Sequence, residues 1–183
     1  MAVASAGSAA LATAALLLSG CGHALDPPSF AGGTPQMRPE RFFDGETRST
    51  GVLETAGGAP SQRFSVQGHG RALPGGRFQL DQTVAFQGQP PKARTWIMRR
   101  LDEHHYTASL TDAAGPVSAE AWGDLFHITY PLKGVPLGRF EQWIYLQPDG
   151  CTVINEATAR VAGIVVRRVS ERISRVDAAA GCR

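Results

Sequence analysis

Most of the chain consists of short segments in which apolar and polar residues alternate. Within Phe140–Leu146 one parity is mostly apolar, while the other carries Glu141, Trp143 and Tyr145. Alternation with a period of two is typical of a β-strand that buries one face. Runs of this kind predict strands at Thr47–Glu54, Gln62–Arg71, Arg77–Phe86, Ala93–Leu101, Tyr106–Asp112, Leu125–Leu132, Arg139–Gln147 and Thr152–Glu156.

Turn-forming residues separate these segments at short intervals. The turns are Gly57-Gly58, Pro74-Gly75-Gly76, Gly88-Gln89-Pro90-Pro91, Asp102-Glu103, Gly115-Pro116, Gly134 and Pro148-Asp149-Gly150. Evenly spaced short strands joined by hairpins predict an antiparallel meander. A long meander tends to close, because closure removes the exposed edges. The expected fold class is therefore mainly β, an antiparallel meander barrel of eight to ten strands.

The last segment supports two interpretations. Val161, Ile164, Val165 and Val169 fall on one helical face, at spacings of three and four. The same segment is dense in β-branched residues, which favour strands. We predict one short helical turn near Ala157–Ala162, followed by a closing strand at Ile164–Arg175.

The longest apolar run of the chain lies near the N-terminus, at Ala9–Gly20. It is shorter than the roughly 20 residues that a membrane-spanning helix needs, but it suits the apolar region of a signal peptide. It leads into Leu18–Cys21 (LSGC), which resembles the lipobox of bacterial lipoproteins, where the leader is cut before a cysteine that then carries lipid. Met1–Leu18 contains no Lys or Arg, unlike an ordinary signal peptide, so the true translation start could lie elsewhere. The alternative is a free cysteine after an Ala-rich terminus.

These features divide the chain into four parts. We expect a signal peptide at residues 1–20, a lipidated Cys21 with a flexible Pro- and Gly-rich tether at 21–37, a barrel domain at 38–176 and a disordered tail at 177–183. Gly22, with no Asp at that position, resembles lipoproteins sorted to the outer membrane. The resemblance implies an envelope protein that faces the periplasm and is held in the membrane through Cys21.

The predicted domain also resembles an uncharacterised family of bacterial lipoproteins with a lipocalin-like barrel, domain of unknown function 3833. The resemblance extends from Pro39 to Val176. It rests on Pro39-Glu40, Phe42-Phe43, Gly45, Trp96, Arg99-Arg100-Leu101, Tyr106, Gly115-Pro116, Tyr130, Trp143, Tyr145-Leu146, Asn155 and Ala157. The chain departs from the family at Glu141-Gln142 and in the segment after Asn155, which lacks the usual lysine-containing turn. The resemblance implies a lipocalin-like (calycin-type) barrel and carries no activity.

Aromatic residues lie on successive predicted strands, and several could line one interior cavity. The candidate lining residues are Trp96, Arg100, Tyr106, Tyr130, Trp143 and Tyr145. A barrel of this size is about wide enough for one small ligand, and aromatics with a few polar tips are the usual lining of such a pocket. The expected ligand is a lipid or another amphiphile. The alternative is a filled core in which the rings pack against each other, leaving an envelope structural or interaction protein.

Three further assignments concern single residues. Arg99 and Arg100 have opposite parity, so one of them points inward, where it could bind an anionic group or form a structural pair. Asn155 would order the turn after the strand at Thr152–Glu156. Cys151 and Cys182 could form a disulfide, with two unpaired thiols as the alternative.

Composition narrows the function classes. The chain is 43% hydrophobic and 19% charged, which is ordinary for a globular domain. A net charge of +2 is too small to indicate nucleic-acid binding, although basic residues gather at Arg160–Arg175, where they could face anionic head groups. The five histidines show no metal-ligand spacing, and no nucleophile motif is present. We therefore expect neither an enzyme nor a bound cofactor or metal.

Overall fold

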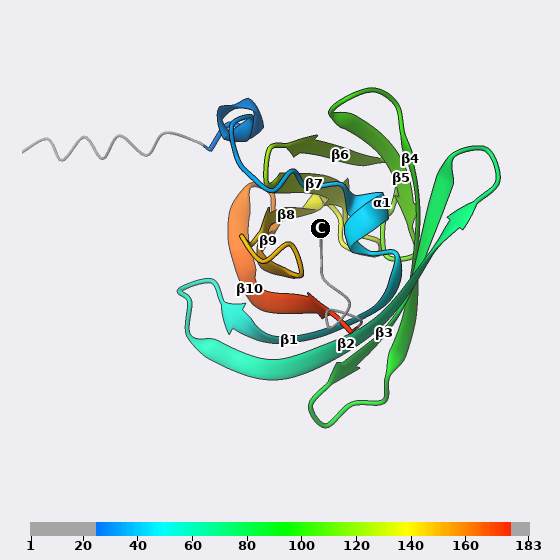
Figure 1. Ribbon diagram of the computed structural model, residues 1–183. Coiled ribbons are helices and arrows are strands. Elements are labelled where there is room, and N and C mark those ends of the chain that lie inside the picture. The colour runs from blue at the N-terminus through cyan, green and yellow to red at the C-terminus, as the bar shows by residue number, and fades with distance from the viewer. Residues whose placement is uncertain (1–24, 177–183) are drawn as a thin grey trace, which may run out of the picture.

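Ten antiparallel strands close on themselves in the computed structural model, which describes residues 25–176. Each strand pairs with its neighbours in sequence, and β1 pairs with β10 to complete the ring. Figure 1 looks down this ring and shows α1 lying within it. The elements are η1 (Pro27–Phe30), α1 (Pro39–Phe42), β1 (Gly45–Thr55), β2 (Pro60–Leu73), β3 (Arg77–Phe86), β4 (Lys92–Arg100), β5 (His105–Leu110), β6 (Val117–Trp122), β7 (Leu125–Pro131), β8 (Gly138–Leu146), β9 (Thr152–Val161) and β10 (Ile164–Arg175).

The predicted antiparallel meander barrel is confirmed, at ten strands. The closing strand begins and ends where the sequence predicts, at Ile164 and Arg175. One strand, β6, was not among those predicted. It carries Ala119 and Ala121 on its buried face, and alanine has a low strand propensity.

The predicted helical turn at Ala157–Ala162 is wrong. Residues 157–161 belong to β9, which pairs with β8 on one side and β10 on the other. Ala157 and Ala159 point into the barrel, and partners on both sides outweigh the helical preference of alanine. A tight turn at Ala162 and Gly163, both with positive φ, then leads into β10.

The predicted tether is also wrong for the part that the structure describes, residues 25–37. Met37 is fully buried, and its backbone N–H donates to the carbonyl oxygen of Gly123. Phe30 of η1 packs on aromatic rings of β8. These apolar side chains explain why the segment lies on the barrel. The predicted leader, Cys21 and the tail at 177–183 lie outside the described residues.

The two ends of the barrel differ. We call the end that carries α1 the helix end; it also holds the connections at 74–76, 101–104, 123–124 and 147–151. The opposite end, the loop end, holds the connections at 56–59, 87–91, 111–116, 132–137 and 162–163. The guanidinium of Arg175 fixes α1 by donating to the carbonyl oxygens of Arg41 and Phe42.

The interior is mostly apolar. Large side chains of β3 to β8, together with Phe42 and Phe43, form one continuous core, in which Phe126 is fully buried. The opposite wall is made of smaller residues, such as Gly68 and Gly70 on β2. Among residues 25–176, no helix is both long enough and apolar enough to span a membrane.

Candidate functional site

Among the polar side chains of the interior, four form one connected group on the neighbouring strands β8, β9, β10 and β1. We call Gln142, Asn155, Glu171 and Ser49 the polar cluster. Asn155 is 3% exposed and Gln142 is 7% exposed. Each lies at an inward position of its strand, so the pleat directs all four toward the barrel axis.

Hydrogen bonds join the polar cluster across the strands. The amide nitrogen of Asn155 donates to Oε2 of Glu171 at 2.9 Å and to Oε1 of Gln142 at 3.2 Å. The hydroxyl of Ser49 donates to Oε1 of Glu171 at 2.5 Å. The carboxylate of Glu171 is thus held by one amide and one hydroxyl.

Two atoms of the polar cluster have no hydrogen-bond partner among the described residues. They are Nε2 of Gln142, a donor, and Oδ1 of Asn155, an acceptor. Leaving a buried polar atom unpaired costs about 1–3 kcal/mol. Both side chains border an interior cavity of about 30 Å³, which is room for about two water molecules. An unpaired donor and acceptor beside a cavity are therefore available to a guest that offers both.

Arg94 of β4 borders the same cavity. Its Nε donates to Oε1 of Gln82 at 3.0 Å, and Trp96 donates to that same oxygen at 2.9 Å. The guanidinium carbon lies 5.9 Å from the Trp96 ring centroid. The terminal nitrogens of Arg94 form no hydrogen bond with the described residues. The cavity thus has a guanidinium and a carboxylate on its border.

The predicted lining residues fall into three groups. Trp96 borders the cavity of about 30 Å³ beside the polar cluster. The ring of Tyr130 packs edge-on against the ring of Trp96, with 5.8 Å between the ring centroids. Tyr106 and Arg100 border a second cavity, of about 110 Å³, beside Glu40 at the helix end. Trp143 and Tyr145 lie elsewhere. The structure does not bring the six residues to one pocket.

At the second cavity, the Tyr106 hydroxyl donates to Oε2 of Glu40 at 3.1 Å. Arg100 alternates in phase with the inward residues Trp96 and Met98 of β4. Its guanidinium nevertheless points to the β4–β5 connection, where it donates to the carbonyl oxygens of Asp102 and Glu103. Arg100 orders the β4–β5 turn.

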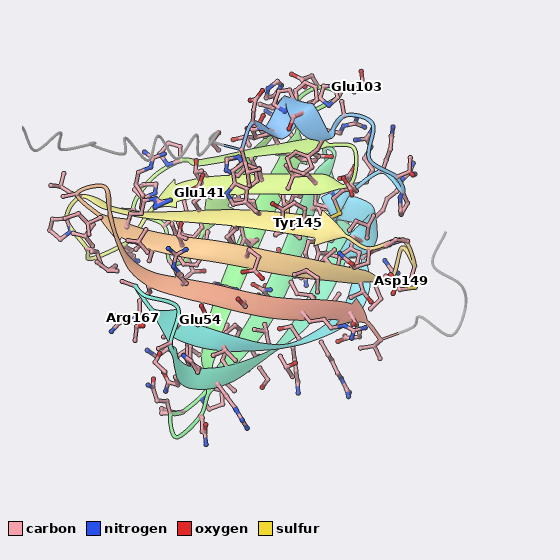
Figure 2. All side chains as sticks on the ribbon, turned by 90° about the vertical axis from the view of Figure 1, so that its left-hand side faces the viewer. Glu54, Glu103, Glu141, Tyr145, Asp149 and Arg167 are labelled. Atoms are coloured by element: carbon pink, nitrogen blue, oxygen red, sulfur yellow. The ribbon has the colours of Figure 1, made fainter. Side chains whose placement is uncertain are left out.

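Trp143 and Tyr145 cannot line the interior, because they lie on the outer face of β8. Their neighbours Gln142 and Ile144 take the buried positions, and adjacent residues of a strand point to opposite faces. Phe30 packs on both rings from outside, with its ring centroid 6.5 Å from that of Trp143 and 5.8 Å from that of Tyr145. Figure 2 shows Tyr145 and Glu141 on the same strand. The strand parity in the sequence could have shown this.

The predicted role of Asn155 in a turn is likewise wrong, because β9 continues past it to Val161. Asp149 orders the β8–β9 turn instead. Its carboxylate accepts the backbone N–H groups of Cys151 and Thr152 at 2.9 Å, and the Thr152 hydroxyl at 2.8 Å. Asn155 belongs to the polar cluster.

Arg94, Gln142 and Glu171 were not predicted as site residues from the sequence. All three are polar residues at inward positions of their strands, and a polar residue at a core position was the available signal. Gln142 was noted only as a departure from the family pattern. Among the described residues, no group of three or more His, Cys, Asp or Glu could hold a metal ion.

Cys151 is disulfide-bonded in the structure. The other two cysteines of the sequence, Cys21 and Cys182, lie outside the described residues. The pairing of Cys151 with Cys182 therefore stays a prediction.

The interior tyrosines give the barrel a pH dependence. Burial raises the pKa of Tyr130 from 10.0 to about 12, against the opposing charge of Arg94. The unfolded chain ionises this tyrosine near pH 10, so stability that is present below pH 10 is lost as the pH rises toward about 12. At about 1.4 kcal/mol per pKa unit, the loss is about 3 kcal/mol. Urea unfolding of Tyr130→Phe should show a shallower loss in this range than the native protein.

Burial also raises the pKa values of Tyr106 and Tyr145, so the variant should keep part of the alkaline loss. Parallel stability curves for the native protein and Tyr130→Phe above pH 10 would contradict the assignment to Tyr130.

The architecture is shared with solved structures and defines a lipocalin-like barrel. The S-type phycobiliprotein lyase CPES from Guillardia theta is 10% identical, with a TM-score of 0.58, over 76% of this chain and 93% of that chain. A protein of unknown function from the DUF3598 family of Nostoc punctiforme is 18% identical, with a TM-score of 0.56. That match covers 78% of this chain and 50% of the other. At these identities the likeness shows the fold alone.

The family itself is shown by sequence. The model of the family described as "Protein of unknown function (DUF3833)" matches residues 15–175, which is most of the chain. The chain therefore belongs to the DUF3833 family. No curated protein matches it.

Proposed function

We propose that this chain is a lipid-anchored protein of the bacterial envelope whose barrel binds a small amphiphile by its polar end. The observation that carries the binding is the pair of unpartnered atoms, Nε2 of Gln142 and Oδ1 of Asn155, in an apolar interior. Together they suit a group that both accepts and donates hydrogen bonds, such as a carboxylic acid or an amide. The apolar side chains around them suit the rest of an amphiphile.

Binding is favoured over catalysis by the chemistry of the polar cluster. Two amides and a hydroxyl-bound carboxylate select a guest by hydrogen bonding. A phycobiliprotein lyase shares this fold, so a barrel of this kind is compatible with more than a structural role. The likeness carries no residue of that protein over to this chain.

A second candidate is an envelope protein with a filled barrel that uses its outer face. The size of the interior cavity favours it, because about 30 Å³ holds only about two water molecules. Any larger guest must displace side chains such as Trp96 or Phe126. The two candidates therefore differ in whether the interior opens.

Native mass spectrometry of the full-length protein, extracted from membranes in mild detergent, separates the two. The binding proposal expects an added mass that corresponds to one amphiphile. A double variant, Gln142→Leu with Asn155→Leu, should lose that mass, because the donor and acceptor are gone. Gln67→Leu, on an exposed position of β2, is the matched control and should keep it.

Thermal unfolding of the same samples shows whether the double variant still folds. A native protein that carries no added mass would contradict binding and favour the filled barrel. Retention of the mass by a folded double variant would contradict the polar cluster as the binding site.

The lipid anchor is proposed from the sequence Leu18–Cys21. The family match begins at residue 15 and so includes this stretch. Gly22 supports the outer membrane as the destination. Cys21→Ser should move the protein from the membrane fraction to the soluble fraction on cell fractionation. Unchanged fractionation of Cys21→Ser would contradict the lipid anchor.

A further inference from the structure

Two neighbouring connections at the loop end present apolar side chains to solvent. Leu137 is 77% exposed and Ile164 is 71% exposed, and Val135 beside them is exposed as well. We call these three residues the loop-end patch. The backbone N–H of Ala162 donates to the carbonyl oxygen of Leu137 at 3.1 Å, so the two connections lie together. Val161 pairs with Gly138 of β8 and with Ile164 of β10, so the β7–β8 and β9–β10 connections are held next to each other.

The backbone holds the loop-end patch in place. Leu137 has a φ of 56°, in the left-handed region that a bulky side chain rarely adopts. Val135 packs over Gly138, where an added Cβ would lie 2.8 Å from Cγ1 of Val135. The hydrogen bonds from the Gly138 N–H to the Val135 carbonyl oxygen and from the Ala162 N–H to the Leu137 carbonyl oxygen hold this turn, so the exposed leucine is presented from a defined backbone.

Unpaired cations surround the loop-end patch. Lys133 and Arg139 flank the β7–β8 connection, are exposed and form no ion pair with any described residue. Arg167 and Arg168 are exposed on β10, and their guanidinium groups donate only to backbone carbonyl oxygens, those of Val166 and Ala56 respectively. Figure 2 shows Arg167 at the end of the barrel opposite Asp149.

Few acidic residues lie at this end, and one of them is already ion-paired. Glu141 accepts from His127 and pairs with Arg160 at 3.7 Å. Glu54 lies opposite Arg168 in the register of β1 and β10, and it accepts the hydroxyl of Ser170, a neutral group that leaves the carboxylate charge in place. Asp112, next to Lys133 through a backbone hydrogen bond, is the remaining acidic residue. Cations therefore outnumber the acids that could neutralise them around the patch.

We propose that the loop end docks on an anionic lipid surface. Leu137, Ile164 and Val135 enter the boundary between head groups and acyl chains, while the surrounding lysine and arginines bind lipid phosphates. Apolar residues ringed by cations are the pattern of interfacial membrane binding, and the charge is complementary to anionic lipid. This contact is separate from the anchor at Cys21 and from the interior polar cluster.

A local probe tests which end of the barrel meets the membrane. The full chain carrying Leu137→Trp is mixed with vesicles of phosphatidylethanolamine and phosphatidylglycerol that contain brominated acyl chains, which quench nearby tryptophan. Leu101→Trp is the matched control, because Leu101 is 56% exposed at the helix end. The fluorescence of the native tryptophans is subtracted with the unsubstituted protein. We then expect strong quenching of the tryptophan added at position 137 and no quenching of the tryptophan added at position 101.

Charge is tested in the same assay. Lys133→Gln and Arg139→Gln, in the Leu137→Trp background, should each weaken vesicle binding about fivefold. Arg99→Gln, on an exposed position near the helix end, should have no effect. Replacing phosphatidylglycerol by phosphatidylcholine should also weaken binding, because the anionic phosphate is then compensated.

The proposal is overturned by equal quenching at positions 137 and 101, or by no quenching at position 137. Quenching that does not respond to Lys133→Gln, Arg139→Gln or the lipid charge also overturns it. An acidic protein partner in place of lipid would give no quenching at position 137, with binding to the protein and none to vesicles. Circular dichroism of each variant establishes that the barrel is folded, and the exposure of Leu137 makes loss of folding unexpected.

Discussion

Replacing Gly70 by alanine is expected to destabilise the barrel by about 3 kcal/mol, the cost of forcing an atom into a packed interior. Gly70 faces inward on β2, beneath the link between α1 and β1. An added Cβ would overlap the backbone carbonyl of Phe43 and lie 2.6 Å from a ring carbon of Phe78. A backbone carbonyl cannot rotate away as a flexible side chain can, so α1 itself would have to move.

Urea unfolding of the full chain measures this loss. Gly57→Ala in the β1–β2 turn is the matched control, because no atom lies within 4 Å of its added Cβ. The control should change stability by less than about 0.5 kcal/mol, as for ordinary surface substitutions. Equal stability of Gly70→Ala and Gly57→Ala would show that α1 yields without cost.

Replacing Phe126 by alanine is expected to cost about 4 kcal/mol. Phe126 is among the largest fully buried side chains, and its ring meets Tyr106 edge-on at 5.8 Å. Its removal takes a full aromatic ring from the core. Because Phe126 also borders the interior cavity, the space that it leaves adjoins the polar cluster.

Chemical unfolding tests the cost, with Phe86→Ala as the control, since Phe86 is only half-buried and should lose less. The same variant bears on function. If the barrel binds an amphiphile, the enlarged cavity should take up a longer guest, and native mass spectrometry would detect its mass. A loss of stability for Phe126→Ala no greater than that for Phe86→Ala would contradict the assigned packing.

Most of the architecture was predictable because alternation records which face of a strand is buried. The strands around Arg77–Phe86 and Arg139–Gln147 have strong apolar parities and were placed within a few residues. β6 was missed because its inward residues include Ala119 and Ala121, which give a weak pattern. In β9 the local preference of Ala157 and Ala159 for helix was overridden by the two neighbouring strands.

The candidate site was harder to predict, because it depends on which distant residues meet. Ser49 and Glu171 are 122 residues apart in sequence, yet they share a hydrogen bond. No local pattern reports such a pairing. Trp143 and Tyr145 show a different failure, since aromatic character was weighed above the strand parity that placed them outside. Polar residues at inward positions were the more informative signal.

The order of the strands also limits how the barrel can close during folding. Every pairing except one joins neighbours in sequence, so hairpins can form one after another as the chain becomes available. The seam between β1 and β10 is the exception, and it must wait for the last strand. The hydrogen bond from Ser49 to Glu171 crosses this seam. The polar cluster is therefore completed only when the barrel closes, and a guest held by it would stabilise the closed barrel over every intermediate that still has two free edges.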